Sequence, residues 1–397
     1  MVGILDGLRV IDMGHFVAVP SAGAVLADWG AEVLKIEPPT GEKQRGIMAL
    51  SDTAVNWRFE VHNRNKRSIA LDLKKEEGRD ILYKLVSRAD IFMSNYQLSA
   101  LTRLKMDYDT VSKVNSRLIY AYLTGYGTAG PDKDMRGFDI AAGWAHSGIQ
   151  HLLGESGGVP PMQRGGVIDR TAGFQIVAGI LAALYHREKT GKGQELSLSL
   201  YHCGIWTLAA DLQVVLGGLP SGVHNRLITI NPLSNTYQTG DGRWIQLAML
   251  QSDLSWHDFC LAIQKPELEN NPKFVDMKAR AVNCEELIRI LDEVFVTRTI
   301  EEWEKILRAN NCIYSRVQTP EEVINDPQAL VNNFFEEIDH PVAGKAKYVT
   351  TPVKFRQNPV SAITPAPETG QHTEEVLLEL GYDWDDISKF KDNKIIP

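Results

Sequence analysis

Asp169 is the residue in this sequence that is best placed for chemistry. It follows a glycine pair in the segment RGGVIDRTAG and stands just before an apolar stretch that predicts a long helix. An aspartate at that position can act as an N-cap, accepting hydrogen bonds from the free amides of the first helical turn. The same amides can instead orient and stabilise a reactive carboxylate, with Gly173 leaving room for a bulky partner over the turn. Spacing alone favours the N-cap.

The glycine motifs that bind phosphates are missing. The chain opens with a strand, a helix and a strand ending at Glu37, where a ribose-binding acid would sit in a dinucleotide-binding fold. After the first strand it reads GHFVAVPSAG, which is not G-x-G-x-x-G, so the turn that cradles a pyrophosphate is not supplied. Nicotinamide and flavin cofactors are therefore not expected.

Apolar periodicity predicts alternating strands and helices in the first half of the chain. The expected strands are 8–13, 32–37, 68–73, 91–95, 118–123 and 195–200, and the expected helices are 21–29, 76–88 and 171–186. Strands that alternate with helices of this length indicate an α/β fold with a parallel sheet covered on both faces. The segment 127–166 is rich in Gly and Pro, so regular structure should be interrupted there.

A smaller α+β unit is expected after the GGLPSG linker. It would contain a hairpin over 237–250, a helix over 284–295, and two helices opened by Thr299 and Thr319, each with the spacing of a capping box. We divide the chain into a large domain over 1–220, a small domain over 221–325, and a carboxyl-terminal segment over 326–397 that returns to the large domain.

Composition limits the function classes. The chain has 397 residues, 44% of them hydrophobic and 23% charged, as in a soluble globular protein, and its net charge of -8 argues against nucleic-acid or membrane partners. Its four cysteines are too few and too scattered for a disulfide framework or a metal motif, which favours the cytoplasm. No metal and no tightly bound cofactor are expected.

Nine segments together resemble the class III coenzyme A transferases over almost the whole chain. They are LxGLRVIDMG, PSAGAVLADWGAEVLKIEPPTGE, NRNKRSIALDLK, NxQxSALTRLKMDY, LTGYGTAGP, the D-x-x-x-G from Asp169 to Gly173, LYHREKTGKGQ, TGDGRWIQL and HTEEVLLELGY. No single segment is highly specific for this family, but the nine segments in this order are. The segment GYGTAGPDKDMRGFD and a presumed strand, SLYHCGIW, look most like the branch that acts on (R)-2-hydroxy acids, such as phenyllactate and 2-hydroxyisocaproate, in amino-acid fermentation.

The resemblance implies a fold, an assembly and a reaction. The fold would be a Rossmann-like large domain with a smaller domain, and two chains would interlock like rings in a homodimer. The carboxylate matching Asp169 would attack an acyl-CoA thioester, so that CoA passes to a second carboxylic acid through a mixed anhydride and an aspartyl-CoA thioester. Coenzyme A and its thioesters would be substrates. An aspartate suits the role because it is ionised at neutral pH without a dedicated base.

The resemblance also implies where CoA binds. By position in the matching segments, its contacts would fall on His15, Phe16, Ala18, Leu71, Lys74, Asn95, Tyr96, Arg103 and Arg136. Lys74 and Arg103 would otherwise be solvated charges at helix ends. His15 would otherwise be a loop histidine held by hydrogen bonds.

Departures from the family pattern bear on the substrate. The formyl-CoA branch has glutamine where this chain has Val17 and tyrosine where it has Arg58, so oxalate is not the expected substrate. We expect Trp57 and Arg58 to form an acceptor pocket, the indole contacting the side chain and the guanidinium binding the carboxylate.

Two alternatives to a transferase stay open. The 2-methylacyl-CoA racemase branch pairs the aspartate with a histidine in a G-H-D motif, which here reads Gly137-Phe138-Asp139. Racemisation therefore lacks its second base. A CoA-binding subunit without catalytic activity is the other alternative, and the presence of Asp169 argues against it.

Overall fold

The computed structural model describes residues 3–46, 55–358 and 362–397, which fold as two compact units. The larger unit comprises Met1–His151, Pro161–Ser221 and Val331–Pro397, and the smaller one comprises Leu152–Pro160 and Gly222–Leu330. Each unit has its own hydrophobic core. The candidate site residues singled out in the sequence all lie in the larger unit.

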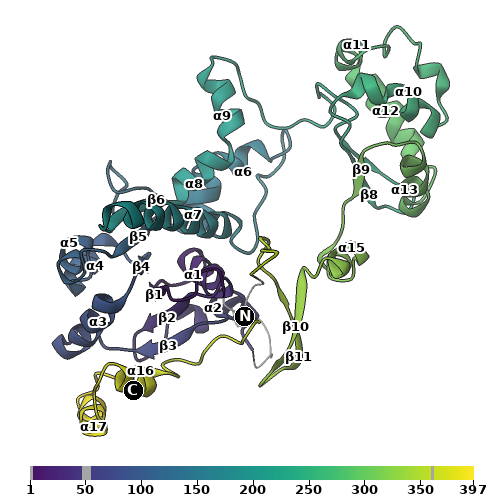
Figure 1. The fold of residues 1–397 in the computed structure, drawn as a ribbon. Helices are drawn as coiled ribbons and strands as arrows, with labels where there is room; N and C mark the ends of the chain where they lie inside the picture. The colour runs from purple at the N-terminus through teal and green to yellow at the C-terminus, as the bar shows by residue number, and fades with distance from the viewer. Residues whose placement is uncertain (1–2, 47–54, 359–361) are drawn as a thin grey trace. The chain divides into compact units, whose positions relative to one another are not determined.

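A six-stranded parallel sheet forms the centre of the larger unit (Figure 1). Its strands are β1 (Arg9–Met13), β2 (Glu32–Glu37), β3 (Arg67–Ala70), β4 (Ile91–Ser94), β5 (Ile119–Thr124) and β6 (Gln194–Ser199). They are ordered β3-β2-β1-β4-β5-β6, and every neighbouring pair is parallel. This is the strand order of a Rossmann fold. The predicted α/β class, parallel sheet and six strands are confirmed, although β3 ends at Ala70 instead of residue 73.

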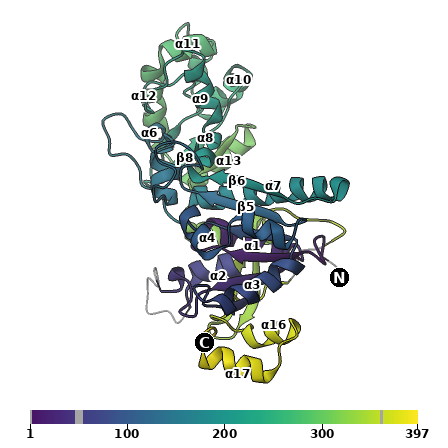
Figure 2. The same ribbon diagram turned by 90° about the vertical axis from the view of Figure 1, so that its left-hand side faces the viewer.

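Helices cover the sheet. In chain order those of the larger unit are α1 (Ala18–Asp28), α2 (Trp57–Asn63), α3 (Glu76–Arg88), α4 (Leu98–Leu104), α5 (Tyr108–Val114), α6 (Ile149–Leu152), α7 (Val167–Thr190), α8 (Leu200–Thr207), α9 (Ala209–Leu216), α16 (Thr373–Glu379) and α17 (Trp384–Asp392). The core joins Ile11, Leu34 and Phe92 of the strands to Leu82 of α3 and Leu377 of α16. These residues hold the carboxyl-terminal helices against the amino-terminal half of the sheet (Figure 2).

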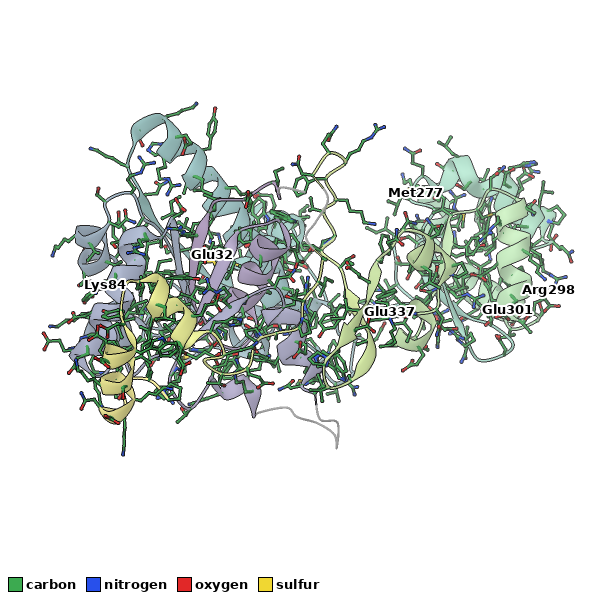
Figure 3. The ribbon with its side chains drawn as sticks, turned by 60° about the horizontal axis from the view of Figure 1, so that its bottom comes forward. Glu32, Lys84, Met277, Arg298, Glu301 and Glu337 are labelled. Carbon is green, nitrogen blue, oxygen red and sulfur yellow. The ribbon has the colours of Figure 1, made fainter. Side chains whose placement is uncertain are left out.

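The return of the carboxyl terminus also shows in a single contact. The Lys84 ammonium group of α3 lies 3.9 Å from the centre of the ring of Tyr382, a residue between α16 and α17 in the chain. Figure 3 shows Lys84 beside these carboxyl-terminal helices. A cation over an aromatic face is attracted by the ring quadrupole. A short antiparallel pair, β10 (Phe335–His340) and β11 (Gly344–Val349), belongs to the same unit.

Regular structure between β5 and β6 is more extensive than the sequence predicted. The Gly-rich segment contains a π-helix, η2 (Asp139–Ala145), and the helix α6. The predicted helix over 171–186 is α7, which already begins at Val167. The segment SLYHCGIW was expected to be a strand, and this is wrong: its residues after Ser199 form α8. The error arose because a short apolar run does not distinguish a strand from a buried helix.

α7 is long and apolar enough to span a membrane by length and composition. Core helices of globular proteins meet the same two criteria. Here α7 buries residues such as Ile176 and Ile180 and packs against α1, α8 and the sheet.

The smaller unit carries a three-stranded antiparallel sheet of β7 (Thr236–Gln238), β8 (Trp244–Leu247) and β9 (Tyr314–Arg316). Its helices are α10 (Ser252–Ala262), α11 (Met277–Val282), α12 (Cys284–Phe295), α13 (Ile300–Ala309) and α14 (Pro320–Val323), followed by α15 (Pro327–Val331). The predicted hairpin and α12 are confirmed. Both capping boxes form as well, at Thr299 and Thr319.

Candidate functional site

The carboxyl edge of the parallel sheet gathers several predicted residues. The His15 backbone N–H donates to Asn95 Oδ1 at 2.9 Å, and Asn95 Nδ2 donates back to the His15 carbonyl at 2.8 Å. The His15 ring meets Tyr96 edge-on with centroids 4.9 Å apart, and Phe16 meets Phe138 in the same way at 5.3 Å. Parallel strands end at one edge, which is why residues after β1 and β4 meet there.

The loop from His15 to Ala18 is held in a strained and desolvated position. Phe16 adopts a left-handed backbone conformation with φ of 62°, which is uncommon for a residue with a side chain and indicates a position fixed by its surroundings. Burial lowers the pKa of His15 to about 4, helped by the nearby positive charges of Lys35 and Lys43. His15 is therefore neutral at pH 7.

A buried ionic network fixes the start of this loop. The Lys66 ammonium group donates to Asp12 Oδ2 at 2.7 Å and to the Pro20 carbonyl at 2.8 Å. Asp12 Oδ1 in turn accepts the Gly14 N–H, and Lys35 donates to the Gly14 carbonyl. Buried charges are tolerated only when paired in this way. The network ties β1, α1 and the peptide of Gly14 together.

Asp169 is not the N-cap of α7. The helix begins at Val167 after Gly166, whose φ is 72°, so Asp169 is the third helical residue. The Val167 N–H donates to Gln163 Oε1 at 3.2 Å. The Asp139 carboxylate faces the backbone N–H groups of Ile168 and Asp169. Gln163 thus binds one free donor of the first turn, and Asp139 faces two others. The N-cap is Gly166, so the N-cap interpretation of Asp169 is wrong.

The Asp169 carboxylate lies beside Val17 across Gly166. A methyl group added to Gly166 would come 3.2 Å from Val17 Cγ1 and 3.4 Å from Asp169 Oδ2. Among the described residues, no donor makes a hydrogen bond to this carboxylate. Burial and the nearby charge of Asp139 raise its pKa to about 7, and the charge of Arg170 opposes this shift. Asp169 is therefore an uncapped and partly desolvated carboxylate.

Gly173 has a different role from the one expected. A Cβ at Gly173 would lie 2.2 Å from Ser21 Oγ and 3.1 Å from the Ala18 carbonyl oxygen. The space that glycine leaves is filled by α1, and it does not open toward a ligand. Gly173 lets α1 and α7 approach closely, which places Val17 next to Asp169.

The remaining predicted residues are more scattered. Ala18 is buried in the first turn of α1, and Leu71 is part of the core, with its backbone N–H donated to the Glu37 carbonyl. Lys74, Arg103 and Arg136 are exposed. Among the described residues, no hydrogen bond or ion pair joins these three side chains to the His15 cluster.

Trp57 and Arg58 diverge from each other. The Trp57 ring contacts His340 and Tyr348 of the β10–β11 pair, at 5.6 and 6.1 Å between centroids. The Arg58 charge instead acts on Arg170, whose pKa is lowered by burial and by Arg58. Arg58 therefore lies toward the start of α7, whereas Trp57 packs on the carboxyl-terminal segment.

Sequence reasoning missed four residues around Asp169: Asp139, Gln163, Arg170 and Cys203. Asp139 was noted only as the third residue of Gly-Phe-Asp, and no spacing links it to a helix that starts at Val167. The signal for Arg170 was its adjacency to Asp169. Among the described residues, no group of three or more His, Cys, Asp or Glu side chains is arranged to hold a metal ion.

Known proteins resemble this chain along almost its whole length. Residues 5–373 match the model of CoA-transferase family III. The chain is 35% identical over 402 residues to the (R)-2-hydroxy-4-methylpentanoate CoA-transferase of Clostridioides difficile, covering 99% of both chains. It is 32% identical over 401 residues to the cinnamoyl-CoA:phenyllactate CoA-transferase of Clostridium sporogenes, covering 99% of this chain and 97% of the relative.

A solved structure agrees with these relatives. The crystal structure of a CAIB/BAIF family protein from Brucella suis has a TM-score of 0.84 and 28% identity to this chain, covering 96% of this chain and all of the other. The family match spans both described units, so it applies to the chain as a whole. The chain therefore belongs to CoA-transferase family III and is an enzyme of that class.

Proposed function

We propose that this enzyme moves CoA between an acyl-CoA and a carboxylic acid through covalent intermediates on Asp169. The observation that carries the proposal is the uncapped Asp169 carboxylate beside Val17, in a helical turn whose first N–H is bound by Gln163 and whose next two N–H groups face Asp139. A carboxylate without competing donors keeps its lone pairs available for attack on a carbonyl carbon.

The steps balance without an external acid or base. A carboxylate oxygen of Asp169 attacks the thioester carbonyl, giving a mixed anhydride and CoA thiolate. The thiolate attacks the Asp169 carbonyl carbon, giving an aspartyl-CoA thioester and releasing the first acid as its carboxylate. The acceptor carboxylate attacks this thioester and expels the thiolate, which then takes the acceptor acyl group and regenerates the Asp169 carboxylate.

The surroundings of Asp169 suit an anhydride that water must not reach. Val17 lies beside Asp169, and its neighbour Phe16 packs edge-on against Phe138. Excluding water protects the anhydride from hydrolysis and strengthens every polar interaction made with it. The glycine turn before α7 is a source of backbone N–H donors for the oxyanion of each addition step.

CoA is expected to lie along the carboxyl edge of the sheet. His15, Phe16, Asn95 and Tyr96 line that edge, and Ala18 and Leu71 are the two further contacts that the resemblance implies. The net charge of -8 does not attract the CoA phosphates, so local basic residues must bind them. We expect the exposed cations Lys74, Arg103 and Arg136 to do so.

An (R)-2-hydroxy acid or a related enoyl acid is the proposed acceptor class. Two relatives at 35% and 32% identity act on acids of this kind by their names. Val17 offers an apolar contact beside Asp169, and Arg58, near Arg170, offers a cation for the acceptor carboxylate. A panel of hydroxy, enoyl and dicarboxylic acids tests this class, and Arg58→Ala should raise the KM for the acceptor while Trp57→Ala should change it less.

We further infer that the enzyme is an interlocked homodimer that works in the cytoplasm. α9 has no buried residue, although most of its side chains are apolar, and such a surface calls for a partner. All four cysteines are buried free thiols, as a reducing compartment allows.

Chemical trapping tests the central proposal. Acyl-CoA and hydroxylamine should convert the Asp169 side chain of the wild type to a hydroxamate, detected by peptide mass spectrometry. Asp169→Asn should give no adduct and lose CoA exchange by at least about a thousandfold, because the nucleophile is gone. Asp109→Asn, which alters an exposed acid in the first turn of α5, should behave as the wild type.

The same experiment separates the alternatives. Full exchange by Asp169→Asn would overturn the proposal. A CoA-binding subunit would show no adduct and no exchange. A racemase would incorporate solvent deuterium at the α carbon without exchanging acids.

A further inference from the structure

Asp139 is buried close to Asp169, yet the proposed transfer steps do not use it. Its side chain is 5% exposed, and neither carboxylate oxygen has a hydrogen-bond partner of good geometry among the described residues. Gln163 is 7% exposed, and its Nε2 is likewise unpartnered. Two buried polar groups without full partners are costly unless they serve a purpose.

The packing around Asp139 fixes where its charge acts. A Cβ at Gly143 would lie 3.3 Å from Asp139 Oδ1 and 2.8 Å from Ile168 Cγ2, so η2 and the start of α7 are in close contact. The carboxylate faces the N–H groups of Ile168 and Asp169 and the side-chain amide of Gln163. These amides form the positive end of the α7 dipole, which attracts an anion.

We propose that Asp139, together with Gln163, is a positioning residue that faces the amide donors at the start of α7, competes with Asp169 for them and so keeps the Asp169 carboxylate uncapped for attack. Without this pair, the carboxylate of Asp169 would turn to the vacant amides, as acids in the first turn of a helix do. A capped carboxylate is a weaker nucleophile, because attack must first break its hydrogen bonds. This inference rests on the proposed role of Asp169.

The Asp139 charge has a second effect on the nucleophile. The groups that face Asp169 in the described structure are Asp139 from η2, Arg170 on its own helix and Cys203 from α8. Burial raises the pKa of Cys203 to about 11, so it stays a neutral thiol at pH 7. After burial, Asp139 is the largest cause of the raised Asp169 pKa. Removing its charge should therefore let Asp169 ionise at lower pH.

Two substitutions of Asp139 separate the effect of its oxygen facing the α7 amides from the effect of its negative charge. Asp139→Asn keeps an oxygen facing the amides but removes the charge, so kcat at its plateau should stay within about threefold while the acid limb of the pH profile moves down by about one unit. Asp139→Ala removes both, so kcat should fall at least about tenfold with the KM for acyl-CoA nearly unchanged. Gln163→Leu should also lower kcat.

Controls distinguish this inference from the role of Asp169 itself. Glu188→Gln, at the exposed far end of α7, should leave the pH profile unchanged, and circular dichroism should show that each variant folds. An Asp139→Asn profile superimposed on the wild type, together with wild-type kcat in Asp139→Ala, would overturn the inference. The hydroxamate on Asp169 would still form in that case, so the proposed function would stand.

Discussion

Asp169 sits where its ionised form is disfavoured. Burial and the like charge of Asp139 raise its pKa to about 7, so about half of the chains carry the anion at pH 7. A carboxylate that binds protons more tightly is also a better nucleophile when ionised, and general acids and bases work best with a pKa near the working pH. The environment therefore lowers the ionised fraction of Asp169 at pH 7 and makes the ionised carboxylate a better nucleophile.

This environment predicts that Asp169 destabilises the folded chain at high pH. The pKa rises from 3.8 in the unfolded chain to about 7 in the folded one, so the favourable contribution is complete below pH 4 and is lost as pH rises through 7. Asp169→Asn should raise the free energy of unfolding at pH 8 by about 2 kcal/mol, roughly half the full linkage because the group is partly exposed, and change it little at pH 4.

Urea unfolding at fixed chain concentration, at pH 4 and pH 8, measures this difference. Asp109→Asn on α5 is the control, since Asp109 is exposed and should give no pH-dependent gain. If Asp169→Asn were equally or less stable than the wild type at pH 8, the raised pKa of Asp169 would be wrong.

At the level of elements, the close approach of α1 and α7 builds the site. The D-x-x-x-G segment singled out Asp169 in the sequence, and the glycine in it faces a helix. Its Cβ would meet backbone atoms of α1, namely the Ala18 oxygen at 3.1 Å and the Ala22 nitrogen at 3.3 Å, besides Ser21 Oγ at 2.2 Å. Backbone atoms cannot move away from an added Cβ without moving the whole helix, whereas a flexible side chain can.

Gly173→Ala should therefore push the two helices apart. We expect it to lower the free energy of unfolding by about 1–3 kcal/mol, as overpacking does, and to lower kcat because Val17 and Asp169 move relative to each other. Gly179→Ala on the same helix meets only the Leu196 side chain, at 3.2 and 3.9 Å, and should be neutral or stabilising by up to about 1 kcal/mol from helix propensity. Equal stability of the two variants, measured by urea unfolding, would contradict this packing argument.

The elements that were predicted well carry strong local signals. The bounds of β2, α3 and α12 match the sequence predictions, because apolar periodicity and flanking turns mark them clearly. The start of α7 was placed too late, since it depends on the left-handed conformation of Gly166 and on Gln163, which no local pattern reveals. The pairing of Asp139 with this helix start depends on tertiary packing across the chain, which sequence periodicity does not encode.

At the scale of the whole molecule, the larger unit has apolar surface that its own chain does not cover. Leu216 of α9 is 79% exposed, Trp206 of α8 68% and Tyr185 of α7 66%. Burying such surface is favourable by about 25 cal/mol per Å². Single exposed apolar residues are common on protein surfaces, but several large ones on three successive helices indicate an interface. A second copy of the chain is the partner we propose.

Interlocking makes a prediction that an ordinary dimer does not share. Light scattering should give the mass of two chains, unchanged on dilution. Mixing folded tagged and untagged enzyme should yield no mixed dimer, because chains linked like rings separate only by unfolding, whereas denaturing and refolding the mixture should produce it. Leu216→Asp should reduce the yield of dimer on refolding, while Val282→Asp, at a 77% exposed position on α11, serves as the matched control. A monomer mass, or mixed dimers formed without denaturant, would contradict the interlocked assembly and leave the apolar face of α9 to another partner.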